Sequence, residues 1–419
     1  MKYKTYNCNA YKVHTIKTDK FKTTHLEIIF RKKAVSEELC AYSFLGDILS
    51  ESTKKYPRRK DLVTKYEELY KASVYASTVR TGNILNFQFI SDFIDPTYIS
   101  EDNYLEEIIK TIMEMVFNPN VQNDEFDLKT FKIVKERLKR EIISIKDNPT
   151  KESIKAALKL IPGNSPSSFN MLGTIEELEE ITPSSLYKTY KTLLKEFTCD
   201  IFVIGNEDMD ELVTLINKYF KKRIITPLEL DLPVHNSFSK VTKETKKSDN
   251  VQANLVMLLN ISNLTQKEQD ITMHVFNYIF GSGGLNSKLY QSIREKNSLC
   301  YGISSMYLKY DSLLLIHTSL ENKNVDKAIS LVKKDLQAMK NGDFTLDEVN
   351  DAINNMQVSI DFASDNNISV LNNYVFHEFA NLMFLEERKK LFQETTKEDI
   401  INVAKKIKLV ITFTLAGKE

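Results

Sequence analysis

The chain has 419 residues, of which 42% are hydrophobic and 27% charged, as is ordinary for a globular protein. Basic and acidic residues number 57 each, so no net charge draws the chain to nucleic acid or to an anionic membrane. No apolar run is long enough to span a bilayer, and the first residues lack the apolar core of a signal peptide. The sequence therefore predicts a cytoplasmic protein of two or three domains, without nucleic-acid or membrane partners.

The four cysteines are scattered along the chain and show no C-x-x-C spacing; they are Cys8, Cys40, Cys199 and Cys300. This pattern is typical of reduced, packed thiols in a cytoplasmic protein. A zinc cluster built from them is not expected.

Two parts of the chain show the same order of predicted elements. The first part has a strand at 25–30, helices at 37–49 and 60–70, and strands at 74–78 and 83–89. The second part has a strand at 254–259, helices at 267–280 and 285–296, and strands at 300–306 and 312–318. Strands that pair directly and are covered by helices indicate an α+β fold.

Each part continues through helices and closes on a strand. The continuation of the first part comprises helices at 104–117, 124–146 and 184–194, a strand at 200–206 and a helix at 209–220. The continuation of the second part comprises helices at 325–340 and 346–363, a helix after Thr396 and a strand at 409–414. A period of about 225 residues is too long for a solenoid. It predicts two homologous domains, 1–225 and 251–419, joined by a linker at 226–250 that carries two prolines and a lysine-rich run.

One arginine and one tyrosine, seven residues apart, flank a predicted turn in the second domain. Arg294 lies near the end of a helix, and Tyr301 opens the next strand. If the turn reverses the chain, the guanidinium and the phenol converge and can hold a peptide carbonyl. The alternative is a structural ion pair beside a half-buried strand tyrosine.

Several segments, in order, resemble motifs of the insulinase–pitrilysin family of zinc peptidases. They are Leu172–Leu178 with Ile181–Thr182, Ile204–Asn206, Gly283–Leu289 and Arg294–Lys296. The resemblance covers nearly the whole chain and implies two homologous α+β domains, each a mainly antiparallel sheet covered by helices, as in LuxS/metallopeptidase-like folds. Within the family the chain is most similar to the bacterial zinc-less, non-catalytic paralogue of the Gram-positive type, whose label refers to elongation factor P modification.

The zinc motif of this family is degenerate in the chain. Active members carry His-x-x-Glu-His on the first helix, which puts both imidazoles on one face, and a glutamate ligand on a later helix. Here Ser43, Gly46 and Asp47 stand at the three motif positions, and Glu141 matches the later ligand. No two of the six histidines are three or four residues apart, so the resemblance implies no metal and no catalytic residue. Glu141 alone is also typical of a helix surface charge or a salt-bridge partner.

The resemblance implies a non-catalytic subunit of a heteromeric peptidase-like complex. The expected partner is a zinc-bearing paralogue that forms a heterodimer, or a second copy of the chain, and zinc is expected only in the partner. Arg294 and Tyr301 would bind the main chain of a peptide substrate. Two alternatives stay open: a structural or assembly protein with the peptidase fold and no role in proteolysis, and a hydrolase with another site. The sequence shows no G-x-S-x-G, Walker or dinucleotide-binding motif that would support the latter.

Overall fold

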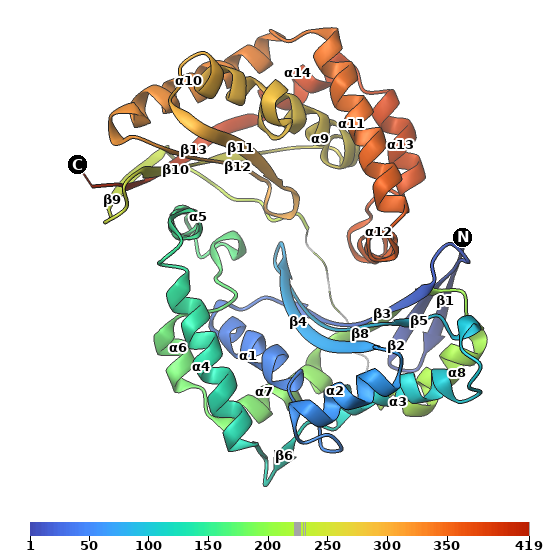
Figure 1. Cartoon of the computed structure of the whole chain (residues 1–419). Helices are drawn as coiled ribbons and strands as arrows, with labels where there is room; N and C mark the ends of the chain where they lie inside the picture. The colour runs from blue at the N-terminus through green and yellow to red at the C-terminus, as the bar shows by residue number, and fades with distance from the viewer. Residues whose placement is uncertain (222–227, 229, 231, 419) are drawn as a thin grey trace. The chain divides into compact units, whose positions relative to one another are not determined.

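The computed structural model describes residues 1–221, 228, 230 and 232–418, which fall into two compact units (Figure 1). Unit 1 comprises Met1–Ile143, Asn170–Leu230 and Asn366–Val375. Unit 2 comprises Ser144–Phe169, Asp231–Asp365 and Phe376–Glu419. The division into 1–225 and 251–419 stays a prediction, and the compact units differ from it by two segments, one from each half of the chain.

Unit 1 is built on a six-stranded sheet with the order β1-β2-β8-β3-β5-β4. The strands are β1 Lys2–Cys8, β2 Tyr11–Lys17, β3 Thr23–Lys33, β4 Ser73–Thr81, β5 Ile84–Ile94 and β8 Thr198–Gly205. β2 and β8 pair in parallel and all other neighbours are antiparallel. β3 lies in the middle of the sheet and eight consecutive residues, 24–31, are buried, because both of its faces are covered.

The helices of unit 1 pack against this sheet and against each other. They are α1 Leu39–Leu49, α2 Arg59–Glu68, α3 Tyr104–Phe117, α4 Leu128–Ser144, α6 Ile175–Glu180, α7 Pro183–Glu196 and α8 Met209–Tyr219. Short elements complete the unit: η1 Ser36–Glu38, η2 Pro96–Tyr98 and the hairpin β6 Val121–Gln122 with β7 Glu125–Phe126. α7 begins where the sequence predicts, because Thr182 and Ser185 form a capping box around Pro183.

Unit 2 repeats this plan with a five-stranded sheet in the order β11-β12-β10-β13-β9. The strands are β9 Thr242–Lys247, β10 Ala253–Ile261, β11 Cys300–Leu308, β12 Leu313–Leu320 and β13 Ile407–Ala416. β9 pairs in parallel with β13, as β2 does with β8, and the other pairs are antiparallel. β9 lies in the predicted linker, 226–250, so part of that segment is a strand of the unit 2 sheet. Residues 226, 227, 229 and 231 of the predicted linker lie outside the described residues.

The helical layer of unit 2 contains both α-helices and turns of π-helix. The long helices are α10 Val325–Asn341, α11 Leu346–Ser364, α13 Leu385–Gln393 and α14 Lys397–Lys405, while α12 Asn367–Ala380 begins in unit 1 and ends in unit 2. The π turns are η4 Glu268–Thr272, η5 Tyr278–Ser282 and η7 Tyr290–Glu295, with α9 Met273–Asn277 between the first two. The other short elements are η3 Pro166–Ser168, η6 Gly284–Asn286, η8 Lys309–Asp311 and η9 Asn322–Asn324.

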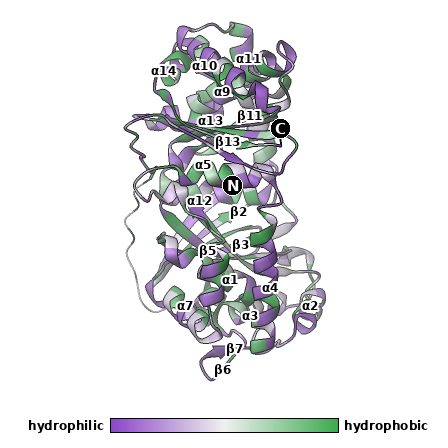
Figure 2. Ribbon diagram, turned by 90° about the vertical axis from the view of Figure 1, so that its left-hand side faces the viewer, coloured by the Kyte–Doolittle hydropathy of each residue, from purple (hydrophilic) through white to green (hydrophobic). Residues whose placement is uncertain are grey.

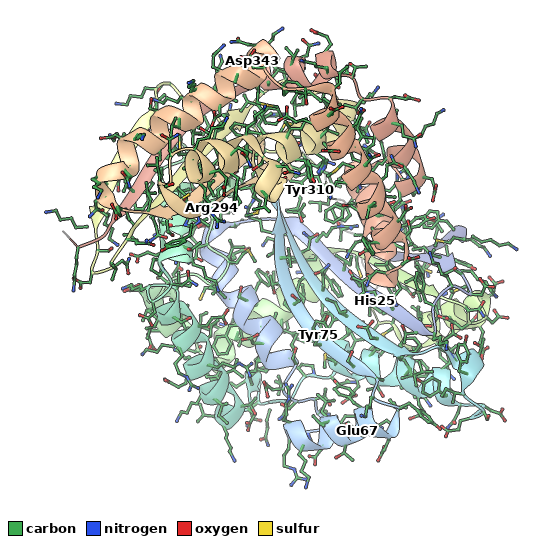
Figure 3. All side chains as sticks on the ribbon, turned by 45° about the horizontal axis from the view of Figure 1, so that its top comes forward. His25, Glu67, Tyr75, Arg294, Tyr310 and Asp343 are labelled. Atoms are coloured by element: carbon green, nitrogen blue, oxygen red, sulfur yellow. The ribbon has the colours of Figure 1, made fainter. Side chains whose placement is uncertain are left out.

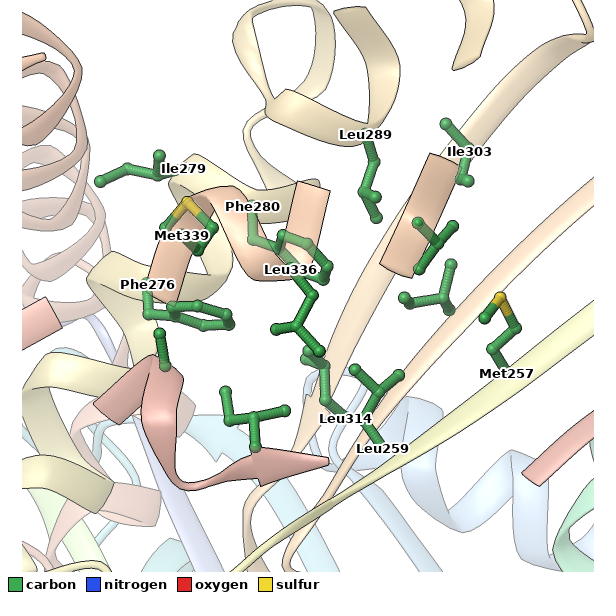
Figure 4. Close-up of a cluster of buried hydrophobic side chains, with 14 of the residues drawn as sticks. Met257, Leu259, Phe276, Ile279, Phe280, Leu289, Ile303, Leu314, Leu336 and Met339 are labelled. Carbon is green, nitrogen blue, oxygen red and sulfur yellow. The ribbon is translucent and has the colours of Figure 1, made fainter. Parts of the chain in front are cut away.

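The sheet of unit 2 has a hydrophobic core on each face. On the helical side, Phe276 and Phe280 pack with Leu314, Leu336 and Met339 (Figure 4). The other face is covered by α5 Pro149–Lys159, which comes from the first half of the sequence and contacts β10 and β13. Figure 2 shows hydrophobic residues along the strands of both sheets.

The fold class predicted from the sequence is confirmed: each unit is an α+β domain with a mainly antiparallel sheet covered by helices. Within the described residues, no helix has the length and apolarity needed to cross a membrane.

Candidate functional site

The four residues matched to the zinc motif lie together in unit 1. Ser43, Gly46 and Asp47 on α1 and Glu141 on α4 line one hollow of about 170 Å³. Strand β4, at the edge of the sheet, forms another wall of this hollow. The four positions therefore come together as the positions of a metal site would, although their side chains are not those of the zinc motif.

Asp47, which lines this hollow, pairs with an arginine for which the sequence alone predicted no role. Arg137, one turn before Glu141 on α4, places Nη2 3.6 Å from Oδ2 of Asp47 and Nη1 2.6 Å from Oε1 of Glu51. Burial raises the pKa of the Asp47 carboxyl; the charge of Glu141 raises it further, whereas Arg137 opposes the rise. The i,i+4 spacing of Arg137 and Glu141 is the signal that could have placed both on one helix face.

Strand β4 packs closely against α1 at Gly46, the position that matches the glutamate of the zinc motif. A Cβ atom on Gly46 would lie 3.2 Å from Oγ1 of Thr78 and 3.8 Å from the backbone of Ala76. The Thr78 hydroxyl donates to the Tyr42 carbonyl at 3.1 Å, and Ser50 Oγ accepts from the Ala76 N–H at 2.9 Å. The glycine thus allows a close approach of strand and helix that a glutamate side chain would disturb.

The residues of this hollow do not fit a zinc ion. Zinc sites in proteins use histidine, cysteine and carboxylate ligands, about three of them even when the site is catalytic. The hydroxyl of Ser43 already donates to the Met171 carbonyl at 2.6 Å, and no histidine lines the hollow. In the part of the chain that the structure describes, no group of three or more histidine, cysteine, aspartate or glutamate side chains is arranged to hold a metal.

The turn expected between Arg294 and Tyr301 is present in unit 2. Ser298 adopts a left-handed conformation, with φ 52°, and its N–H donates to the carbonyl of Arg294 at 2.8 Å. The N–H of Leu299 donates to the carbonyl of Ile293 at 3.0 Å. The chain therefore reverses after η7, and the following strand β11 packs beside it.

The two side chains are available to bind another molecule. Tyr301 is 83% exposed and lies on β11, the edge strand of the sheet, where the pairing with β12 is irregular between Cys300 and Ile303. The side chain of Arg294 is 40% exposed; it lies in the helical layer of unit 2 (Figure 3). Among the described residues, its closest charged partner is Glu295, whose Oε1 lies 3.7 Å from Nε.

The sheet of unit 1 holds a buried charged cluster that sequence spacing did not reveal. Nδ1 of His25 lies 2.7 Å from Oδ1 of Asp92, and Nε2 lies 2.9 Å from Oε1 of Glu27. Burial alone would lower the pKa of His25, but these two carboxylates raise it to about 9. Figure 3 shows His25 on the strands of unit 1. His25 and Asp92 are 67 residues apart and meet only because β3 pairs with β5.

The chain is similar to known proteins in sequence and in fold. Residues 180–356 match the family model described as the peptidase M16 inactive domain. The "Probable inactive metalloprotease YmfF" of Bacillus subtilis is 28% identical over 416 residues, which cover 97% of this chain and 96% of the relative. A conserved protein from Enterococcus faecalis V583 has a similar structure, with a TM-score of 0.94, 24% identity and 99% of both chains covered. A peptidase M16 inactive domain from Pseudomonas fluorescens gives a TM-score of 0.81 at 17% identity, covering 100% of this chain and 98% of that one.

Proposed function

We propose that this chain, which belongs to the insulinase–pitrilysin (peptidase M16) family, is the non-catalytic subunit of a two-chain peptidase. Its role would be to bind the main chain of a peptide substrate through Arg294 and Tyr301. The observation that carries the proposal is the exposure of both donors: Tyr301 is 83% exposed on an edge strand, and the side chain of Arg294 is 40% exposed, with its closest charged partner among the described residues, Glu295, 3.7 Å away.

The chemistry of the two side chains suits a peptide carbonyl. An arginine guanidinium is always charged and presents only donors, and a neutral tyrosine hydroxyl adds one more donor. Donors aimed at an oxygen that gains negative charge stabilise it without moving. Such donors work equally well when they come from a different chain than the one that cleaves the peptide.

The hollow lined by Ser43, Gly46, Asp47 and Glu141, called the degenerate hollow below, supports the need for a second chain to cleave peptides. A side chain at Gly46 would place its Cβ 3.2 Å from Oγ1 of Thr78, so this hydroxyl would have to shift to admit a glutamate, and Arg137 already supplies a cation to Asp47. Peptide cleavage would therefore require a zinc-bearing paralogue with an intact His-x-x-Glu-His motif. A homodimer of this chain would hold two degenerate hollows, so we favour a heterodimer. The four cysteines are free thiols, in keeping with a complex in the cytoplasm.

The proposal can be tested by reconstituting the pair. The chain would be co-purified with a zinc-bearing paralogue from the same genome, and peptide turnover measured for wild type, Arg294→Ala and Tyr301→Phe. Loss of one donor of this kind lowers turnover by about 10²–10³-fold. Thermal unfolding should change little, because neither side chain is buried.

Matched controls are available on the surface of unit 1. Arg58 is an exposed arginine paired with Asp61, and Tyr98 is 58% exposed. Arg58→Ala and Tyr98→Phe should leave turnover unchanged. Full turnover with both Arg294→Ala and Tyr301→Phe would reject substrate binding at this site. A chain that assembles with the paralogue under that outcome would be a structural or assembly protein, the competing proposal.

A further inference from the structure

We propose that Tyr290 is a positioning residue that holds the guanidinium of Arg294 ready for substrate. This inference rests on the proposed function of Arg294. Cζ of Arg294 lies 4.7 Å from the centroid of the Tyr290 ring, within the range of a cation–π contact. Because Tyr290 is 7% exposed and contacts the guanidinium, its action on a substrate would pass through Arg294.

The helical backbone at 290–295 places the side chains of Tyr290 and Arg294 next to each other. Residues 290–295 form a turn of π-helix, in which the N–H of Lys296 donates to the carbonyl of Gln291 at 3.0 Å. Side chains four positions apart on a helical turn lie on the same face, so Tyr290 and Arg294 are neighbours. The turn is closed by Asn297, whose Nδ2 donates to the carbonyl of Ser292 at 2.8 Å. Turns of this kind are rare and occur frequently at functional sites.

The ring of Tyr290 is a fixed platform. It is 7% exposed and belongs to the hydrophobic core of unit 2, together with Leu289 and Ile293. An immobile ring restricts the rotamers of the arginine that stacks on it, and this lowers the entropy lost when Arg294 binds a substrate oxygen. Arg294 is thereby ordered before the peptide arrives.

The competing restraint on Arg294 is weak. The carboxylate of Glu295 is 3.7 Å from Nε, beyond hydrogen-bonding distance, and both side chains are near half exposed, at 40% and 51%. Water screens such a pair, and exposed ion pairs contribute little. The stack on Tyr290 is therefore the contact that sets the direction of the guanidinium.

The test begins with the isolated chain, so that it does not depend on the partner. The Nε–Hε resonance of Arg294 would be assigned by its loss in Arg294→Lys. Its chemical shift carries the ring current of Tyr290. We expect Tyr290→Leu to move the resonance, Tyr290→Phe to preserve its shift, and Phe276→Leu to leave it in place. Phe276 lies in the same core and controls for the loss of a buried ring.

The second readout is turnover by the reconstituted pair. Tyr290→Leu should lower turnover about two- to tenfold, the loss expected for one cation–π restraint, and Tyr290→Phe should restore it. An unmoved resonance in Tyr290→Leu would overturn the inference. So would turnover that falls with Arg294→Ala but not with Tyr290→Leu. Turnover insensitive to Arg294→Ala would instead reject the proposed function, and with it any need for positioning.

Discussion

Replacing His25 by glutamine should change how the stability of unit 1 depends on pH. The imidazole is 1% exposed and lies between Asp92 and Glu27, which hold it as a cation. Glutamine has a similar reach but no charge, so the two carboxylates would lose their counter-ion. The effect should therefore appear where the histidine is charged in the folded chain.

The size and sign of the effect follow from the pKa of His25. Folding raises that pKa from 6.5 to about 9, and each unit corresponds to about 1.36 kcal/mol. The full pKa shift corresponds to about 3 kcal/mol in the free energy of unfolding. Because 37% of the Asp92 side chain is exposed and water screens its charge, we expect a contribution of about 2 kcal/mol. A raised pKa stabilises the folded state fully below about pH 6.5. This contribution is then lost as the pH rises through about 9.

The assay compares wild type with His25→Gln across this interval. Urea unfolding would be followed through hydrogen exchange of β3 and β5 peptides, so that the signal belongs to unit 1. The difference in free energy of unfolding should shrink by about 2 kcal/mol between about pH 6 and about pH 9.5. His235→Gln, at an exposed histidine, is the control and should follow the wild type. A difference that is the same at both ends of the interval would refute the assignment of a buried imidazolium.

Two further changes test the degenerate hollow and the core of unit 2. Restoring His-x-x-Glu-His on α1 should not restore zinc binding, because a Cβ at position 46 would lie 3.2 Å from the Thr78 hydroxyl, which is held by the Tyr42 carbonyl, and because Arg137 lies beside position 47. Metal analysis giving about one zinc per chain would contradict this. Lys309→Met should destabilise unit 2 by about 3 kcal/mol in urea, because it leaves the carboxylate of Asp270, 1% exposed, without its lysine. The exposed Lys323→Met is the control, with an expected change within about 0.5 kcal/mol.

Elements with strong local patterns were predicted almost to the residue. The apolar periodicity of 104–117 coincides with α3, and the pattern at 325–340 is one residue shorter than α10. The strand at 254–259 widens to Ala253–Ile261, because ladder bonds continue beyond the apolar run. Local sequence is sufficient here because one face of each element is clearly apolar.

Elements whose partners lie far away in the sequence were missed. No helix was predicted at α5 or α12, yet α5 buries Ala157 against β10 and β13, and the rings of Tyr374 on α12 and Tyr3 have centroids 4.8 Å apart and are tilted by 31°. β9 is lysine-rich and exposed, so it has no apolar alternation, and only its parallel pairing with β13 makes it a strand. In each case a tertiary contact supplies what local propensity does not.

In the candidate site, too, some features follow from local sequence spacing and others depend on tertiary packing. The helix spacing that places Ser43, Gly46 and Asp47 in one hollow is local, and the match of Glu141 came from the family resemblance. The role of Arg137 depends on the packing of α4 against α1, which no spacing rule states. For Arg294 and Tyr301 the turn was predictable, and the four-residue spacing of Tyr290 and Arg294 is a local signal for their contact on one helix face.

In unit 1, contacts beside the zinc-motif positions hold β4 against α1. These contacts bear on which part of the chain can carry a function. With glycine at position 46, β4 lies directly on α1, and the hydroxyls of Ser50 and Thr78 tie strand to helix. Arg137 pairs with Asp47, at one of the motif positions, and with Glu51. A side chain at position 46 would require the Thr78 hydroxyl, which donates to the Tyr42 carbonyl, to give way. The proposed function therefore rests on unit 2, where Tyr301 is 83% exposed and the side chain of Arg294 is 40% exposed.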